Sequence, residues 1–314
     1  MSQAHEKFVA IRHEISKAVV GNDHAVTGVL VALLGSGHVL LEGVPGTAKT
    51  LLARSLAMAT ALPHTRVQFT PDLMPGDLTG SLIFHSGEFT FRPGPVFTSI
   101  LLADEINRTP PKTQAALLEA MAERHVSVDG HIKLLPDPFI VIATQNPIEH
   151  AGTYPLPEAQ IDRFMMKIQL PLPSRDVEFE VLARHAARFD PTELSSAGIT
   201  AVANADDIRQ ARDEVSQVEV SEQVLGYIVD LVHTTRSLPT VMAGASPRGS
   251  MSLLAAARSW AWLQGRTYVT PDDVKGFALP TLAHRIVLRP EAELDGVRPH
   301  DVISQITASV AVPR

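Results

Sequence analysis

The sequence of 314 residues contains no cysteine. This absence excludes a disulfide framework, a cysteine nucleophile, and zinc or iron–sulfur sites with cysteine ligands. Aromatic residues make up only 5% of the chain and charged residues 19%, whereas hydrophobic residues make up 45%, a composition typical of a globular protein rather than a disordered one. At roughly 150 residues per domain, the length predicts about two domains.

Long apolar runs are lacking as well. The longest, residues 26–34, ends at a Gly-Ser-Gly sequence and is far shorter than the ~20 residues that span a bilayer. The N-terminal residues are mixed polar and charged, without the apolar segment of a signal peptide. We therefore expect a cytoplasmic protein with no membrane span. The net charge of −7 disfavours a dedicated nucleic-acid binder, so no DNA partner is expected.

The first half of the chain alternates short apolar runs with helical patterns. The apolar runs predict five strands, at 39–42, 66–69, 98–103, 139–143 and 164–170, and the amphipathic segments between them predict helices at 49–58 and 111–123. This alternation predicts an α/β fold with a parallel five-stranded sheet covered on both faces. In such sheets ligands bind at the carboxyl ends of the strands, so the loops that begin at Gly43, Asp104 and Asn146 should converge.

Two hairpins interrupt this pattern, and the second half differs from the first. Residues 81–84 and 88–91 flank His85-Ser86-Gly87, and Asp129-Gly130 predicts a type I′ turn between 126–128 and 132–134. Residues 71–80 are expected to form a loop. Beyond Pro173 no strand is predicted, and the patterns predict helices at 175–189, 206–218, 221–234, 248–263 and 271–282. The second half is therefore predicted to be an all-helical domain.

The first motif with chemical meaning is a glycine-containing loop between a predicted strand and a predicted helix, Gly43-Val44-Pro45-Gly46-Thr47-Ala48-Lys49-Thr50. It matches the phosphate-binding pattern G-x-x-x-x-G-K-[ST] except that Ala48 stands in place of the second glycine. Backbone N–H groups and the helix N-terminus would surround phosphate oxygens. Lys49 would neutralise the β- and γ-phosphates, and Thr50 would ligate Mg²⁺.

Two adjacent acids end the apolar run at residues 100–103. Buried carboxylates are costly without a partner, so Asp104 and Glu105 are candidates for chemistry. Asp104 would orient Mg²⁺, and Glu105 would polarise the attacking water. Asn146, at the end of the next strand, offers an amide that could hold this water or the γ-phosphate. Arg163 and Arg248 are candidates to stabilise charge on the γ-phosphate, although for an isolated arginine a surface ion pair is the better explanation.

The order of these motifs resembles that of an AAA+ ATPase and, within that group, the MoxR family. The similarity covers nearly the whole chain and rests on Val20-Gly21-Asn22, the loop 41–50, Asp104-Glu105-Ile106-Asn107-Arg108, Ala143-Thr144-Gln145-Asn146-Pro147, the segment 158–164 and Ser246-Pro247-Arg248. The resemblance implies an AAA+ P-loop core at 1–172, with an insertion at about 78–97 and a hairpin at about 124–136. A linker and connecting helix at 173–205 and a helical lid at 206–314 would follow.

The resemblance also implies roles. Lys49 and Thr50 correspond to Walker A, Asp104 and Glu105 to Walker B, and Asn146 to sensor 1. Arg163 corresponds to the arginine finger that enters a neighbouring subunit's site, and Arg248 to sensor 2. Val20 and Gly21 correspond to the segment beside the adenine. The family implies hydrolysis of ATP with Mg²⁺ in a homo-oligomeric, usually hexameric, ring, and chaperone-like maturation of client proteins, often ones with von Willebrand factor A domains.

Three alternatives remain open from the sequence. A magnesium-chelatase ATPase subunit would carry a similar catalytic set, and a chelatase partner with porphyrin would distinguish it. A nucleotide-gated binding module with little turnover is disfavoured by Glu105, because a pure switch has little need of a water-activating acid. A DNA-handling ATPase is disfavoured by the acidic balance.

Overall fold

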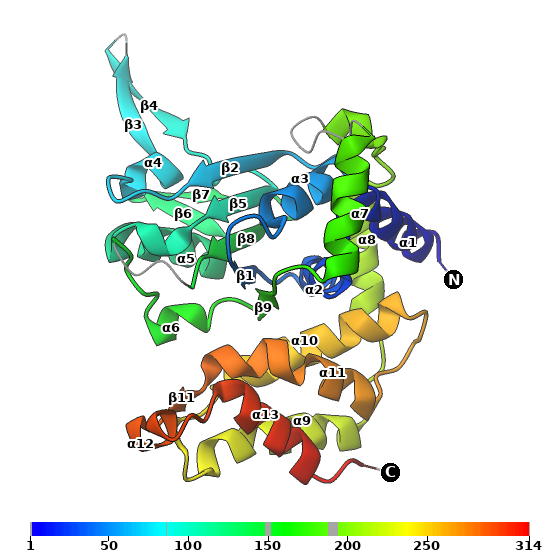
Figure 1. The fold of residues 1–314 in the computed structure, drawn as a ribbon. Coiled ribbons are helices and arrows are strands. Elements are labelled where there is room, and N and C mark those ends of the chain that lie inside the picture. The colour runs from blue at the N-terminus through cyan, green and yellow to red at the C-terminus, as the bar shows by residue number, and fades with distance from the viewer. Residues whose placement is uncertain (1, 86, 148–151, 188–193, 314) are drawn as a thin grey trace.

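The computed structural model of the chain describes residues 2–85, 87–147, 152–187 and 194–313 (Figure 1). At its centre lies a five-stranded sheet in the order β2-β5-β8-β1-β9, in which every neighbouring pair is parallel. The strands are β1 (Val39–Gly43), β2 (His64–Gln68), β5 (Ile100–Asp104), β8 (Ile140–Gln145) and β9 (Met166–Leu170). The α/β prediction and the five predicted strands are confirmed, with their ends moved by one or a few residues.

The two faces of the sheet belong to two hydrophobic clusters. Val39 and Leu41 of β1 point into one cluster and Leu40 into the other, as the two-residue period of a strand requires. The first cluster packs against helices α1 (Gln3–Ser16), α2 (Asp23–Leu34) and α3 (Lys49–Ala59), and the second against α5 (Pro111–Glu123). Burial on both faces explains why the central strands β5, β8 and β1 appear in the sequence as nearly continuous apolar runs, whereas the edge strands β2 and β9 contain polar residues.

The register places all carboxyl strand ends at one edge of the sheet. Val39 pairs with Met166 and Gly43 with Leu170, so β1 and β9 begin and end together. Ile100 likewise pairs with Ile140. This edge, which carries the loops after β1, β5 and β8, is called the carboxyl edge below, and the opposite one the amino edge.

Both predicted hairpins are present. Strands β3 (Gly80–His85) and β4 (Glu88–Pro93) form a hairpin that projects away from the sheet (Figure 1), and β6 (His125–Val128) pairs with β7 (His131–Leu134). Asp129 and Gly130 both have positive φ, +50° and +75°, as a type I′ turn requires. Ser86, in the predicted turn of the first hairpin, lies outside the described residues. The segment 71–80, predicted as a loop, contains the short helix α4 (Pro75–Thr79).

The second half is helical, as predicted, apart from one short ribbon. Helix α6 (Glu158–Ile161) precedes β9, and α7 (Arg175–Ala186) and the turn η2 (Leu194–Ala197) follow it. The predicted lid contains α8 (Ala205–Ser216), α9 (Glu222–Ser237), α10 (Pro247–Leu263), α11 (Pro271–Leu282), α12 (Pro290–Leu294) and α13 (Pro299–Ser309). The absence of strands expected beyond Pro173 is wrong, because β10 (Val241–Ala243) and β11 (Val287–Leu288) pair antiparallel. Strands this short have no detectable period in the sequence. The last two residues of the helix predicted at 175–189 lie outside the described residues.

The lid is docked firmly on the core. One hydrophobic cluster runs through both, joining Met165 and Ile168 of the core to Leu253, Leu282 and Ile286 of the lid. Among the described residues, no helix has both the length and the apolar character needed to cross a membrane.

Candidate active site

The phosphate-binding loop leaves the carboxyl end of β1 and enters α3. Ala48, which precedes the first residue of α3, has φ +62°, and Gly46 has φ +85°. The conformation at Ala48 is one that glycine adopts without strain, which explains why the general pattern has glycine there. At Gly43 a Cβ atom would lie 2.7 Å from the Leu170 carbonyl oxygen, so glycine is required for the close approach of β1 and β9.

Lys49 points back into the loop. Its ammonium group donates hydrogen bonds to the carbonyl oxygens of Gly43 and Val44, and the Thr47 hydroxyl donates to the same Val44 oxygen at 2.9 Å. Burial lowers the pKa of Lys49, and the negative charges of Asp104 and Glu105 oppose this shift. The fold therefore brings the lysine of the loop within electrostatic reach of both acids, although they lie about 55 residues away in the sequence.

Asp104 is held at the end of β5 by residues from both neighbouring strands. Its Oδ1 accepts a hydrogen bond from the Thr144 hydroxyl of β8 at 2.6 Å, and its Oδ2 accepts two from the Arg66 guanidinium of β2, at 2.6 and 3.1 Å. The carboxylate is buried, with the residue 7% exposed. Carboxylate oxygens held in this way form a hard, oriented ligand for a divalent cation.

The backbone conformation at Glu105 ends β5 and turns this residue away from the line of the strand. The φ of Glu105 is +57°, and its N–H donates to the Thr144 hydroxyl at 2.9 Å. The carboxylate Oε2 accepts hydrogen bonds from Gln68 Nε2 at 2.6 Å and from Arg108 at 2.9 Å. Glu105 is thus held by neighbouring side chains in this conformation, and a role in activating water requires that it exchange at least one of these partners.

Two further predicted segments lie at the same edge. Asn146 follows β8, is 9% exposed, and its carbonyl oxygen accepts from Asn107 Nδ2 at 3.5 Å, which connects it to the loop after Glu105. Gly21, in the Val20-Gly21 segment between α1 and α2, has φ +72° and packs on Val177 of α7, where a Cβ atom would come within 2.5 Å. Close by, His24 bonds the Gln169 carbonyl oxygen at 3.0 Å, which places this segment beside the end of β9 and therefore beside the loop at Gly43.

The two predicted arginines lie elsewhere. Arg163 precedes β9 and lines a surface pocket of about 440 Å³ with residues at the C-terminal end of α5, among them Glu119 and Glu123. Arg248 lies in the first turn of α10, next to Ser246, whose hydroxyl donates to Asp162 at 3.0 Å. Both arginines are therefore close to the start of β9, at the amino edge, whereas Lys49, Asp104, Glu105 and Asn146 lie at the carboxyl edge. One subunit does not bring the two groups together.

Comparisons with known proteins identify the family to which this fold belongs. Residues 38–166 match the family model "ATPase family associated with various cellular activities (AAA)", and residues 233–306 match "AAA lid domain". The chain is 43% identical over 312 residues to "Chaperone MoxR1" of Mycobacterium tuberculosis, covering 96% of this chain and 81% of that protein. The chain belongs to the MoxR family of AAA+ ATPases. The α/β core and the helical lid described above are thus those of an ATPase of this family.

Other relatives of this MoxR-family ATPase extend the comparison. It is 46% identical to the uncharacterized protein YeaC of Bacillus subtilis, covering 97% of this chain and 94% of that one. A crystal structure of a candidate ATPase from Cytophaga hutchinsonii superimposes with a TM-score of 0.91 at 39% identity and covers 99% of this chain and 96% of the other. The "Magnesium-chelatase 38 kDa subunit" of Acidiphilium rubrum is more distant, at 27% identity over 78% of this chain and 70% of that one.

Sequence reasoning missed several residues of this MoxR-type site. Arg66, Gln68 and Thr144 bond Asp104 or Glu105, and Arg285 of the lid bonds Asp162 beside Arg163. Arg66 and Gln68 alternate with half-buried positions on β2, an edge strand, and polar residues on an edge strand are ordinary enough to carry no signal. Position at the carboxyl end of a strand is the clue that could have identified Gln68 and Thr144.

Proposed function

We propose that this AAA+ ATPase hydrolyses MgATP at the interfaces between subunits of a ring, and that the cycle drives maturation or activation of client proteins. The observation that carries the proposal is the division of the candidate groups between two edges of the subunit. Lys49, Asp104 and Glu105 occupy the carboxyl edge, while Arg163 and Arg248 occupy the amino edge. A second copy that presents its amino edge to this carboxyl edge completes the set, and repetition of that head-to-tail contact closes a ring.

The residues at the carboxyl edge have distinct tasks. The loop 43–50 surrounds the phosphates with N–H groups, and Lys49 transfers its hydrogen bonds from the loop carbonyls to phosphate oxygens. Glu105 exchanges Gln68 or Arg108 for the attacking water and accepts its proton as the bond to the γ-phosphorus forms, which leaves ADP and phosphate. Asn146 holds the water or the γ-phosphate from the opposite side. Val20 and Gly21 contact the base.

The donor chemistry of the site fits magnesium. Among the described residues, no cluster of three or more His, Cys, Asp or Glu side chains could hold a metal alone, so a cation here must share its ligands with the phosphates. The buried Asp104 carboxylate and the Thr50 hydroxyl would hold it, and both are hard oxygen donors. When bound, the ion neutralises charge on the phosphate oxygens.

The client role rests on the relatives and on the two hairpins. The 43% identical relative is named a chaperone, and the tips of β3–β4, which projects from the core, and of β6–β7 could contact a partner and transmit motion. By the family resemblance, the ring is a hexamer and the client contains a von Willebrand factor A domain.

The proposal keeps the nucleotide-binding core at 1–172, the linker at 173–205 and the lid at 206–314. A chelatase role is less favoured, because the chelatase relative has only 27% identity.

The decisive measurement is steady-state ATP hydrolysis, with Mg²⁺, over a wide range of protein concentration. We expect the activity per subunit to rise with concentration, because each site needs a neighbour, and to be lost in Glu105→Gln. The variant removes the water-activating carboxylate, preserves its shape, and excludes a contaminating ATPase. A constant activity per subunit down to the most dilute sample would contradict an interface site, and full activity in Glu105→Gln would contradict the assigned role of the acid.

A further inference from the structure

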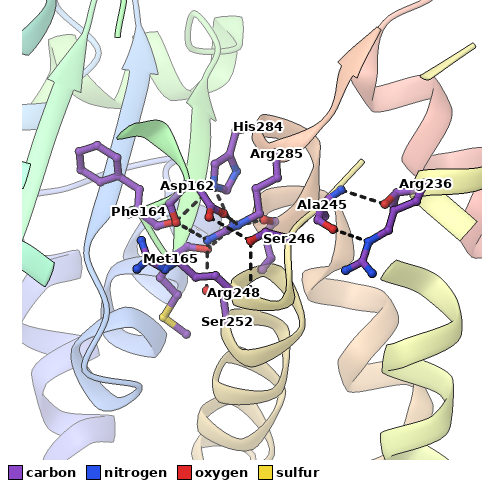
Figure 2. A network of polar contacts seen from close by, with 12 residues as sticks. Asp162, Phe164, Met165, Arg236, Ala245, Ser246, Arg248, Ser252, His284 and Arg285 are labelled. Atoms are coloured by element: carbon purple, nitrogen blue, oxygen red, sulfur yellow. Dashed lines mark hydrogen bonds and ion pairs between the residues drawn. The ribbon is translucent and has the colours of Figure 1, made fainter. Parts of the chain in front are cut away.

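A buried arginine joins the lid to the core close to Arg248 (Figure 2) and bonds the residues on both sides of Arg163 in the sequence. Arg285 lies in η3 (Ala283–Arg285), and its side chain is only 1% exposed. Its guanidinium contacts seven groups: Asp162 Oδ1 (2.6 Å), the carbonyl oxygens of Asp162 (3.1 Å), Phe164 (2.7 Å), Met165 (3.2 Å) and Thr281, Ser252 Oγ (3.1 Å), and His284 Nε2 (2.8 Å). Every nitrogen of the guanidinium is therefore used.

Most of these contacts fall on one stretch of the core, residues 162–165. This stretch connects α6 to β9 and contains Arg163 itself. Because the planar guanidinium donates along fixed directions to the Asp162 carboxylate and to three carbonyl oxygens on both sides of Arg163, it fixes the path of that backbone. Lysine could not reproduce this pattern, since it offers a single nitrogen.

The other oxygen of Asp162 extends the network to Arg248. Asp162 Oδ2 accepts from the Ser246 hydroxyl at 3.0 Å, and Ser246 Oγ in turn accepts the backbone N–H of Arg248 at 3.2 Å, as the N-cap of α10. Arg236 holds the same loop through the Ala245 carbonyl oxygen at 2.8 Å (Figure 2). One carboxylate thus connects the segment of Arg163 to the helix start that carries Arg248.

Burying this ion pair is costly, which indicates that its role is to hold the two segments in position rather than to attach the lid to the core. Burial lowers the pKa of Arg285, the Asp162 carboxylate opposes the shift, and the positive charge of Arg248 adds to it. A buried ion pair is rarely more stabilising than apolar side chains of the same volume. The lid and core already share an apolar interface, so adhesion between them does not require a buried guanidinium.

We propose that Arg285 and Asp162 are positioning residues that fix the spacing between Arg163 and Arg248, so that one subunit presents both arginines together to its neighbour's nucleotide. This inference rests on the proposed interface role of Arg163 and Arg248. It predicts that a subunit with a substituted Arg285 can no longer place Arg163 and Arg248 correctly in its neighbour's site. Its own nucleotide loop, at the opposite edge, should remain intact.

The test uses the full-length assembly and the variant Arg285→Met, which removes the buried charge but keeps an apolar chain of similar length. We expect kcat to fall by roughly tenfold to a hundredfold, while the Kd for a fluorescent ATP analogue stays unchanged. Arg285→Lys should recover little of the lost kcat, because lysine lacks the planar guanidinium with its several N–H donors. Arg266→Met is the matched control: Arg266 forms a bidentate ion pair with the buried Asp273 inside the lid, and its loss should lower stability without changing kcat.

Mixed assemblies separate positioning from a merely structural effect. Mixed with Glu105→Gln subunits, Arg285→Met subunits should regain turnover, because their intact sites receive correctly placed arginines. Mixed with Arg163→Ala subunits they should not. If Arg285→Met does not fold, Asp162→Asn replaces it in the same assays. Unchanged kcat in Arg285→Met, or recovery with both partners, would overturn the inference. Unchanged kcat in Arg163→Ala and Arg248→Ala would instead overturn the interface function on which it rests.

Discussion

His38 shows how one buried residue can make stability depend on pH. The ring lies at the start of β1, where Nδ1 accepts the Val141 N–H at 2.9 Å and Nε2 bonds the Met121 carbonyl oxygen at 3.1 Å. Burial first, and then the positive charge of Arg124, lower the pKa of His38 from 6.5 to about 3. The ring is therefore neutral in the folded state throughout the physiological range and joins the sheet to α5.

The lowered pKa predicts loss of stability in mild acid. Below about pH 6.5 the unfolded chain binds a proton at His38 that the folded chain does not, so the free energy of unfolding falls as pH decreases toward 3, by up to ~1.4 kcal/mol per pH unit from this group. Urea unfolding at several pH values would measure the slope. His38→Asn, which keeps an acceptor for Val141, should be less stable at neutral pH but should lose stability less steeply in acid. Equal slopes in the two proteins would contradict the assignment.

Individual residues also show where sequence reasoning is reliable and where it fails. Lys49, Asp104 and Glu105 follow apolar strands in the sequence, so their convergence at one edge could be predicted from the parallel sheet, and Lys49 is indeed within electrostatic reach of both acids. Ala48 stands where the phosphate-binding pattern has glycine, but its backbone adopts the left-handed conformation that glycine favours. The contact of Arg66 with Asp104 could not be predicted, because it depends on β2 lying next to β5 in the sheet.

At the scale of elements, the β3–β4 hairpin exposes apolar side chains to solvent, at positions where polar side chains are usual. Phe84 is 62% and Phe89 69% exposed, and their ring centroids lie 5.0 Å apart, near the described end of the hairpin. Leu82 and Ile83 on the same strand are also exposed. An exposed apolar cluster on a projecting element is typical of a surface that contacts another protein.

This cluster predicts a separation of client handling from ATP hydrolysis. In Phe84→Ser/Phe89→Ser, the melting temperature and the ATPase rate without a client should change little, because both rings are mostly exposed and the β3–β4 hairpin projects away from the sheet that carries the site (Figure 1). Suppression of the aggregation of heat-denatured citrate synthase, measured by light scattering with ATP present, should be lost. Thr90→Ser on the same hairpin is the polar control. Protection equal to that of the unmodified protein would exclude the hairpin as the client contact.

How well the sequence predicts an element depends on whether local residues or tertiary packing determine it. Strands buried on both faces and helices with caps, such as Thr270 before Pro271, carry strong local signals, and α11 was predicted with correct ends. The β10–β11 ribbon is formed by segments of three and two residues that are distant in sequence. Its existence depends on the packing of the lid helices, which no local pattern describes.

At the scale of the whole molecule, the predicted catalytic groups lie at opposite edges of one subunit. The continuous hydrophobic cluster and the Arg285–Asp162 network connect lid and core, and in the ring proposed above a change of nucleotide at the carboxyl edge of one subunit would be transmitted through the arginines of its neighbour. The sequence could suggest each arginine through its motif. Arg163 directly precedes the strand predicted at 164–170, so its place at the amino edge follows from a parallel sheet. The place of Arg248 could not be predicted, because it depends on how the lid packs against β9.

This arrangement predicts complementation between two inactive variants. Glu105→Gln lacks the acid but retains both arginines, and Arg163→Ala lacks the arginine but retains the acid. In an equal, random mixture, an interface is complete when an Arg163→Ala site faces a Glu105→Gln neighbour, which gives about a quarter of the interfaces in a cyclic assembly. ATP hydrolysis should therefore appear on mixing and approach about a quarter of the activity of the unmodified protein if sites act independently. If Arg163 acted within its own subunit, no mixture of the two variants would hydrolyse ATP, because each chain would lack one required group.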